Sequence, residues 1–203
     1  MRLSAPLAFL LVLIGANAAR AQSGWLLEAV GMAGAPLTPQ QFTRGWGAGL
    51  GIGGSLRVRL TPKVQVGIDA EFIQFTYTGL PRLGGFGGER RYTRVGVPLR
   101  WLWWERESSK KERLSLQLSA GWGRETIEGI TGDRFVRQKS SHDGLALSAG
   151  LRFSRSLYRT TRWSLGARYT YMDLGAEESP GFVSLLVGMQ MPLEGSRPRS
   201  EAP

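Results

Sequence analysis

Four adjacent residues, Ser140, Ser141, His142 and Asp143, supply the residue types of a nucleophilic hydrolase: a hydroxyl, a base and an acid. Neighbours on a strand or in an extended loop point apart, so Ser141 and His142 are poorly placed to share the activating hydrogen bond. His142 is the only histidine, and there is no cysteine, which argues against a zinc site. We expect no catalytic or metal-binding residues here, and we keep a lipid-modifying enzyme as an alternative.

A second candidate is the glycine-rich stretch from Gly49 to Gly54, which matches the dinucleotide-binding pattern G-x-G-x-x-G. That pattern binds a pyrophosphate only where a strand turns into a helix. Here the residues from Ser55 to Leu60 continue a period-2 alternation and no helix follows. We therefore expect no bound cofactor.

A third candidate is a set of arginines and acids interleaved with apolar residues along the chain. Guanidinium groups bind carboxylates through paired hydrogen bonds, so these side chains predict an ion-pair network where they share a confined space. Such a network either fills a narrow interior, which we favour, or sets the selectivity of a pore. Its members are Glu28, Arg57, Arg59, Asp69, Glu71, Arg94, Arg100, Arg152 and Arg168.

The elements that must position these residues are strands. From Trp46 to Leu60, apolar residues alternate with glycine, serine and arginine, so one strand has an apolar face and a polar face. Similar alternation returns at about Trp25–Gly34, Val64–Phe72, Val95–Trp103, Leu114–Trp122, Leu145–Phe153, Trp163–Tyr171 and Val183–Met191.

Longer and shorter connections alternate between these strands, as in an up-and-down barrel with loops at one end and turns at the other. The expected loops are Pro36–Arg44, Thr78–Arg91, Glu128–Asp143 and Asp173–Gly181, and the expected turns are Thr61–Lys63, Glu105–Arg113 and Ser156–Arg162. An even strand number that closes on itself leaves no exposed sheet edge. The prediction is an all-β, eight-stranded antiparallel barrel.

The first residues predict export. Met1 and Arg2 precede an apolar run from Ala5 to Ala16, and Ala19 and Ala21 are small residues suited to signal peptidase. We therefore expect a signal peptide over 1–21, a barrel over 22–193 and a polar tail over 194–203. Export argues against nucleic acid as a partner, although the formal net charge is +10.

Composition narrows the protein class further. Hydrophobic residues make up 42% of the 203 residues, which argues against intrinsic disorder, and the lack of cysteine excludes a disulfide scaffold or a lipid-anchored lipoprotein. Only the N-terminal run approaches the ~18–20 apolar residues of a spanning helix. The chain is therefore not a helical multi-span membrane protein.

Three features place lipid outside the barrel. The polar face is rich in glycine, which suits a narrow lumen, and its cations are arginines, whereas the four lysines fall in or beside turns and loops. Aromatic residues gather near strand ends, as at the two interfaces of a bilayer. The turn-side belt is Trp101, Trp103, Trp104, Phe153, Tyr158 and Trp163, and the loop-side belt is Trp46, Phe72, Phe75, Tyr77, Trp122, Tyr169, Tyr171 and Phe182. A soluble exported barrel that binds an apolar ligand is the alternative.

The chain resembles the small eight-stranded outer-membrane barrels, the OmpA/OmpX-type and OmpW-like group. The resemblance rests on the features above and on the stretch Phe42–Phe75, which contains a glycine-rich strand, the short Thr61–Lys63 turn and a third strand that ends in aromatic residues. The resemblance runs from Trp25 to Met191. It implies a transmembrane β-barrel of the Gram-negative outer membrane, without enzymatic activity, that is inserted by the barrel-assembly machinery. One departure is the C-terminal end: an aromatic residue often closes such barrels, whereas here Met191-Pro192-Leu193 precedes the polar tail.

Cations in the two longest expected loops are candidates for binding surface glycolipid. Arginine and lysine form charge-assisted hydrogen bonds with phosphate, the group that lipopolysaccharide would present. The alternative is that these cations are ordinary solvent-exposed loop residues with no specific partner. The residues are Arg82, Arg90, Arg91, Arg134, Arg137 and Lys139. The expected role is therefore structural or one of surface interaction, with an unidentified external partner.

Overall fold

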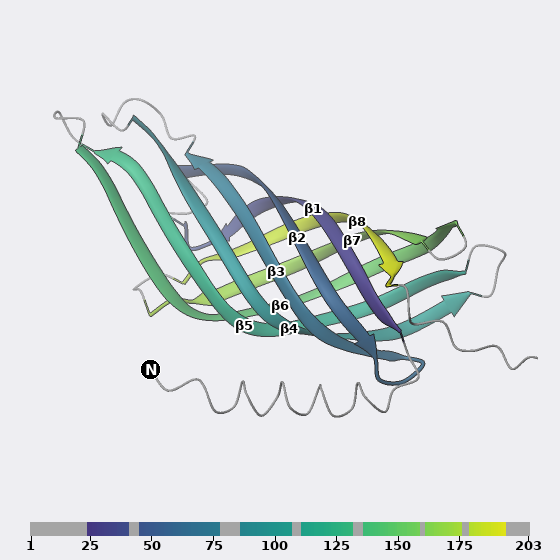
Figure 1. The fold of residues 1–203 in the computed structure, drawn as a ribbon. Coiled ribbons are helices and arrows are strands. Elements are labelled where there is room, and N and C mark those ends of the chain that lie inside the picture. Colours follow the sequence, from purple (N-terminus) through teal and green to yellow (C-terminus); the bar gives the residue numbers. More distant parts are fainter. Residues whose placement is uncertain are drawn as a thin grey trace, which may run out of the picture.

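The computed structural model describes residues 24–40, 45–77, 86–106, 111–131, 136–158, 161–175 and 179–193. Eight strands within them close into one barrel, in which consecutive strands pair antiparallel and the last returns to the first (Figure 1). The prediction of an eight-stranded, all-antiparallel barrel is confirmed. The strands are β1 (Trp25–Thr38), β2 (Trp46–Arg59), β3 (Val64–Tyr77), β4 (Phe86–Arg106), β5 (Glu112–Thr131), β6 (Val136–Tyr158), β7 (Thr161–Asp173) and β8 (Gly181–Pro192).

The expected signal peptide over 1–21 and the tail over 194–203 lie outside the described residues. No helix among the residues that are described is both long and apolar enough to cross a membrane.

Three strands are longer than the alternation predicts. β4, β5 and β6 contain 21, 20 and 23 residues, and the pairing of β5 with β6 continues to Thr131 opposite Val136. The pairing of β6 with β7 already ends at Leu145 opposite Asp173, so the three long strands extend beyond the closed barrel. Residues 86–91 of one long expected loop, and residues 128–131 and 136–143 of the other, are thus strand, which corrects that prediction. The alternation fades there because Arg124 and later outward positions are polar, while backbone pairing continues.

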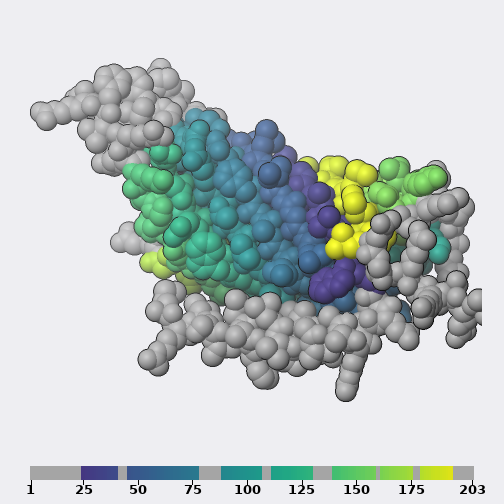
Figure 2. Space-filling view, in the orientation of Figure 1, coloured from purple at the N-terminus to yellow at the C-terminus, as the bar shows by residue number. Residues whose placement is uncertain are grey.

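The outer wall of the barrel is apolar. The side chains of Leu50 and Ile52 on β2 are 73% and 69% exposed, and those of Leu185 and Val187 on β8 are 60% and 62% exposed. The space-filling view shows the side chains of β2, β3 and β4 as a closely packed surface (Figure 2). The apolar face that the sequence places outside is therefore outside.

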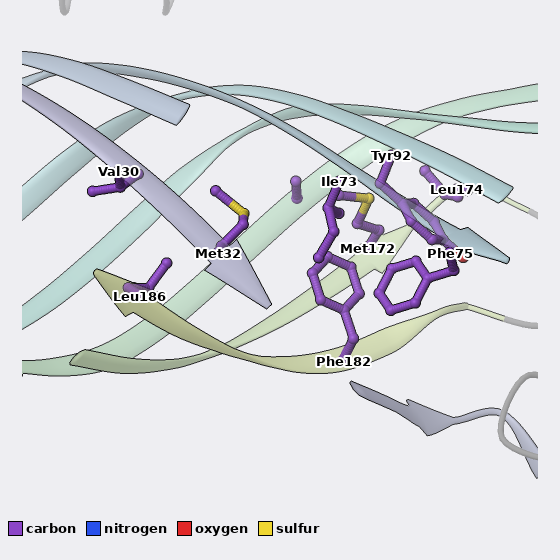
Figure 3. Close-up of a cluster of buried hydrophobic side chains, with 10 residues drawn as sticks. Val30, Met32, Ile73, Phe75, Tyr92, Met172, Leu174, Phe182 and Leu186 are labelled. Atoms are coloured by element: carbon purple, nitrogen blue, oxygen red, sulfur yellow. The ribbon is translucent and has the colours of Figure 1, made fainter. Parts of the chain in front are cut away.

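The interior has two chemically distinct halves, whereas the polar faces of the strands predict a polar lumen throughout. The half near the Thr61–Lys63 turn holds buried arginines and acids. The half toward the loops holds a cluster of buried apolar side chains (Figure 3), namely Val30, Met32, Ile73, Phe75, Tyr92, Ala146, Met172, Leu174, Phe182 and Leu186. We call these ten residues the apolar plug.

Phe75 and Phe182 belong to this plug and not to an aromatic belt, which corrects their predicted position. Their ring centroids lie 5.4 Å apart, and both rings also contact Tyr92, at 5.7 and 5.3 Å. Side chains alternate along a strand, so Phe72 faces outward on β3 while Phe75, an odd number of residues later, faces inward. A phenylalanine side chain suits a lipid-facing surface and a buried core equally well. Only its odd or even position along the strand determines which of these it faces.

Glycines on the inner face of β2 make room for the plug. A Cβ on Gly51 would lie 2.3 Å from the carbonyl oxygen of Phe72 and 2.9 Å from Cγ of Met32. A Cβ on Gly49 would lie 2.7 Å from the ring of Phe75. The bare inner wall of β2 is therefore a packing requirement of the large side chains opposite it.

Candidate functional site

Glu28 on β1 is the centre of the first charged group in the lumen. Its side chain is 3% exposed, and its Oε2 accepts hydrogen bonds from Nη2 of Arg57 at 2.7 Å and from Nη2 of Arg100 at 2.9 Å. Its Oε1 pairs with Arg152 and accepts a hydrogen bond from Nε2 of Gln190 at 3.0 Å. These donors come from β2, β4, β6 and β8, so one carboxylate connects five strands across the lumen. We call Glu28, Arg57, Arg100 and Arg152 the Glu28 cluster.

A second group lies on β3, β4 and β7. Arg94 pairs with Asp69 at 2.6 Å and with Glu71 at 3.2 Å, and Glu71 also pairs with Arg168. The hydroxyl of Ser119 accepts a hydrogen bond from Nη1 of Arg94 at 2.6 Å. Two carboxylates and two guanidiniums balance each other in this group, which we call the Arg94 cluster.

These two clusters contain eight of the nine lumen residues named from the sequence. The exception is Arg59, which lies at the turn end of β2 and interacts electrostatically with Arg113 and Glu105 instead of joining Glu28. Which arginine reaches which acid depends on the cross-barrel geometry, because Glu28 and Arg100 are 72 residues apart in the sequence.

A third ion pair lies near the loop end and was missed by sequence reasoning. Arg90, expected in a loop, belongs to β4; its buried side chain pairs with Glu125 of β5. The Tyr92 hydroxyl donates a hydrogen bond of 2.6 Å to the same carboxylate, and the guanidinium of Arg90 lies 5.9 Å from the ring centroid of Trp46. Arg90 is thus a buried residue of a strand and not an exposed loop cation. The signal in the sequence is that Glu125 shares the inward face of β5 with Gln117.

The remaining cations named from the sequence occupy several positions. Arg91 lies on β4, where it pairs with Glu89 and lies 3.6 Å from Glu128, and Lys139 is exposed on β6. Arg137 also belongs to β6, although its side chain lies outside the described part of the chain. Arg82 and Arg134 lie outside the described residues. The expected loop placement is therefore wrong for Arg91, Arg137 and Lys139, because β4 and β6 extend beyond the apolar band.

Arg124 is a surface cation that sequence reasoning did not single out. It forms two hydrogen bonds with Asp143, at 2.7 and 3.0 Å, and its guanidinium lies 5.4 Å from the ring centroid of Trp122. The hydrogen bond from Arg124 holds the pKa of the Asp143 carboxyl below its ordinary value. Arg124 is the first outward residue of β5 beyond Trp122, where the apolar band ends.

Ser141 and His142 are not arranged as a nucleophile and its base. Ser141 faces Thr126 with their hydroxyl oxygens 3.3 Å apart, and His142, the next residue on β6, points to the opposite side of the strand. No group of three or more histidine, cysteine, aspartate or glutamate side chains among the described residues could hold a metal ion. The chemistry that the barrel does provide is ion pairing in its lumen and at its rim.

No protein-family model matches the chain, and no curated protein matches its sequence. The fold does match solved structures. Neisserial surface protein A superposes with a TM-score of 0.59 at 15% identity, over 84% of this chain and 98% of that one. Ail, the attachment invasion locus protein of Yersinia pestis, superposes with a TM-score of 0.53 at 18% identity, over 83% of this chain and 99% of that one. The chain therefore has the fold of the small eight-stranded outer-membrane barrels.

Proposed function

We propose that the protein is an integral outer-membrane barrel with a structural or surface-interaction role, and that side chains close its lumen. The observation that carries the proposal is the orientation of the strands. Large apolar side chains such as Leu50 and Leu185 are exposed on the outer wall, while Arg57 and Arg94 are buried inside. A charge at the middle of a bilayer costs ~2–4 kcal/mol, so this distribution suits hydrocarbon around the barrel.

The same orientation argues against the soluble alternative. A soluble barrel that carries an apolar ligand has polar side chains on its outer wall and an apolar cavity inside. Here the outer wall exposes leucine, valine and isoleucine, and the Glu28 and Arg94 clusters occupy the half of the interior near the turns. Export by a signal peptide and insertion by the barrel-assembly machinery belong to this proposal.

Membrane fractionation tests the location directly. We expect the protein in the outer-membrane fraction, resistant to extraction with carbonate, and migrating differently in gels before and after boiling, as closed membrane barrels do. Recovery in the soluble periplasmic fraction would refute the proposal.

A closed lumen predicts the absence of a wide aqueous channel. Eight strands enclose a space that side chains can fill, and here the apolar plug and the two charged clusters do so. In planar bilayers, the purified protein should give no steps of the size seen with a general porin inserted under the same conditions. Regular porin-sized steps from the native protein would contradict the closed lumen.

We also propose that the outward cations beyond the apolar band contact phosphate groups of surface glycolipid. Arg124 is the best placed, because it is half-exposed and stacks above Trp122 at the level where the apolar wall ends. Arg91 and Lys139 lie on the same three-stranded extension. The residues outside the described part, Arg82 and Arg134, remain candidates for the same contact.

A matched pair of variants tests this contact. Arg124→Gln should weaken the stabilisation that lipopolysaccharide gives over phospholipid in vesicles. Arg155→Gln should leave it unchanged, because Arg155 is an outward arginine at the opposite end of the barrel, 3.6 Å from Glu112. Equal effects of the two substitutions would remove Arg124 from the proposed surface.

A further inference from the structure

A small polar cavity of about 20 Å³ lies at the turn end of the lumen. Its polar lining comes from several strands and one turn, and consists of Ser115 and Ser154 together with Lys63, Gln65, Arg100, Arg113 and Gln190. A cavity needs roughly 10–15 Å³ to hold one water molecule, so this one accepts a guest of about that size. Donors predominate among these side chains, and no carboxylate lines the cavity.

The adjacent Glu28 cluster carries more positive than negative charge. Three guanidiniums, those of Arg57, Arg100 and Arg152, pair with the one carboxylate of Glu28. The Glu28 oxygens also accept a hydrogen bond from Gln190, so the four or so acceptor positions of this carboxylate are occupied. Asp69 also acts electrostatically on Arg57, but its carboxylate is already paired with Arg94. The excess of two positive charges therefore has no carboxylate left to balance it within the described cluster.

The other charged groups in the described part of the lumen are balanced. The Arg94 cluster has two cations and two anions, and the pair of Arg90 with Glu125 has one of each. At the cavity itself, Arg113 pairs with Glu105 at 2.5 Å, while Lys63 adds one positive charge to the excess that already includes Arg100. Deprotonation of an arginine cannot remove this excess positive charge, because a guanidinium group remains charged at any physiological pH.

Arg100 links the charge excess to the cavity. Its side chain is about 95% buried, lines the cavity, and donates from Nη2 to Glu28 and to Gln117 at 3.1 Å. Its Nε–H has no hydrogen-bond partner although it is buried, and the Nε–H of Arg57 is in the same state. Buried charged donors without an acceptor are strongly unfavourable, so an acceptor that also carries negative charge would satisfy both requirements.

We propose that this cavity binds a small inorganic anion of about the size of chloride. The anion would accept hydrogen bonds from Arg100 and Gln190 and would lie beneath Lys63 and Arg113 at the turn end. The small volume excludes a lipid headgroup or a phosphorylated sugar. The site is distinct from the glycolipid surface, which lies at the opposite end of the barrel.

Bromide provides the direct test because it replaces chloride and scatters X-rays anomalously. Crystals of the full chain soaked in sodium bromide should show an anomalous peak inside the cavity. Bromide found only on the outer surface would overturn the proposal.

Solution stability tests the same site under equilibrium conditions. At fixed ionic strength in detergent micelles, replacing sodium gluconate with sodium chloride should raise the urea midpoint of the native protein. Above the dissociation constant, each tenfold rise in free chloride should increase the folding equilibrium constant about tenfold. Equal midpoints in chloride and gluconate would refute chloride binding.

Two variants locate the effect without removing the buried cluster. Lys63→Gln and Arg113→Gln should each reduce the chloride-dependent shift at least severalfold, because each removes a cation from the lining. Arg155→Gln, on the outer surface, should keep the full shift. A shift that persists unchanged in both cavity variants would place the anion elsewhere.

Discussion

Replacing Glu28 with glutamine removes one negative charge from the centre of the charged half while keeping nearly the same volume. The side chain is 3% exposed and pairs with Arg57, Arg100 and Arg152. Glutamine can still accept a hydrogen bond, but it cannot neutralise three buried guanidiniums. The substitution therefore separates the contribution of charge from that of shape.

The expected loss is large because the remaining cations stay buried. Breaking a buried ion pair by removing one partner costs about 3–5 kcal/mol. That range corresponds to about two to three and a half powers of ten in the folding equilibrium constant. The Glu89→Gln variant is the control: Glu89 pairs with Arg91 at the surface, with side chains 41% and 37% exposed, so its loss should be at most about 1 kcal/mol.

Urea unfolding in micelles, followed by tryptophan fluorescence and by the gel shift of the folded barrel, measures both values. A second substitution tests the cause: adding Arg100→Met to Glu28→Gln should recover at least about 1 kcal/mol, since it removes an unbalanced buried cation. A loss below about 1 kcal/mol for Glu28→Gln, or no recovery in the double variant, would refute the assignment of stability to this charge.

Other predictions follow from packing and from the rim. Gly51→Ala should lower the free energy of unfolding by about 1–3 kcal/mol, because its Cβ would meet Phe72 and Met32. The control is Gly31→Ala, whose Cβ would lie 4.0 Å from the nearest atom. In the same urea titrations this control should change the free energy of unfolding by less than about 0.5 kcal/mol. Phe75→Ala should cost about 3–5 kcal/mol by opening a cavity in the apolar plug, and unfolding that is unchanged would contradict the inward position of this ring. The depressed pKa of Asp143 means that its pair with Arg124 contributes stability above the unfolded pKa of about 3.9 and loses it as the pH falls through the lower folded pKa. Carboxyl NMR should show the pKa of Asp143 rising in Arg124→Gln, and an unchanged pKa would disprove the hydrogen bond as its cause.

The fold could be predicted from the sequence because lipid imposes a simple rule on the outer wall. Every outward position in the bilayer must be apolar, so the alternation around Leu50 and Leu185 defines both the strands and their facing. The rule ends where the bilayer ends. Beyond Trp122 the next outward residues are Arg124, Thr126 and Glu128, so the alternation of apolar and polar residues is lost although β5 continues to Thr131.

The interior obeys no comparable rule, and this explains what the sequence could not show. Inward positions hold Asp69 and Glu71 and then, on the same face of β3, Ile73 and Phe75. Nothing in the composition of one strand says which partners will meet it across the lumen. The acids and arginines could be named as a set, but their division into two clusters depends on the stagger of all eight strands.

The order of these layers along the barrel bears on how the lumen works. From the turn end, a solute first meets the positively charged cavity, then the Glu28 and Arg94 clusters, and then the apolar plug around Phe75. Nine of the ten plug side chains are apolar and cannot replace the hydration shell of an ion, and the one hydroxyl, that of Tyr92, is already bound to Glu125. The plug therefore opposes the passage of an ion to the loop end. An anion drawn in by the positive excess must therefore enter and leave through the turn end. If the cavity binds an anion as proposed, the charged half of the lumen stabilises the fold and holds that anion. The three-stranded extension of β4, β5 and β6 is then the part of the barrel that contacts molecules outside it.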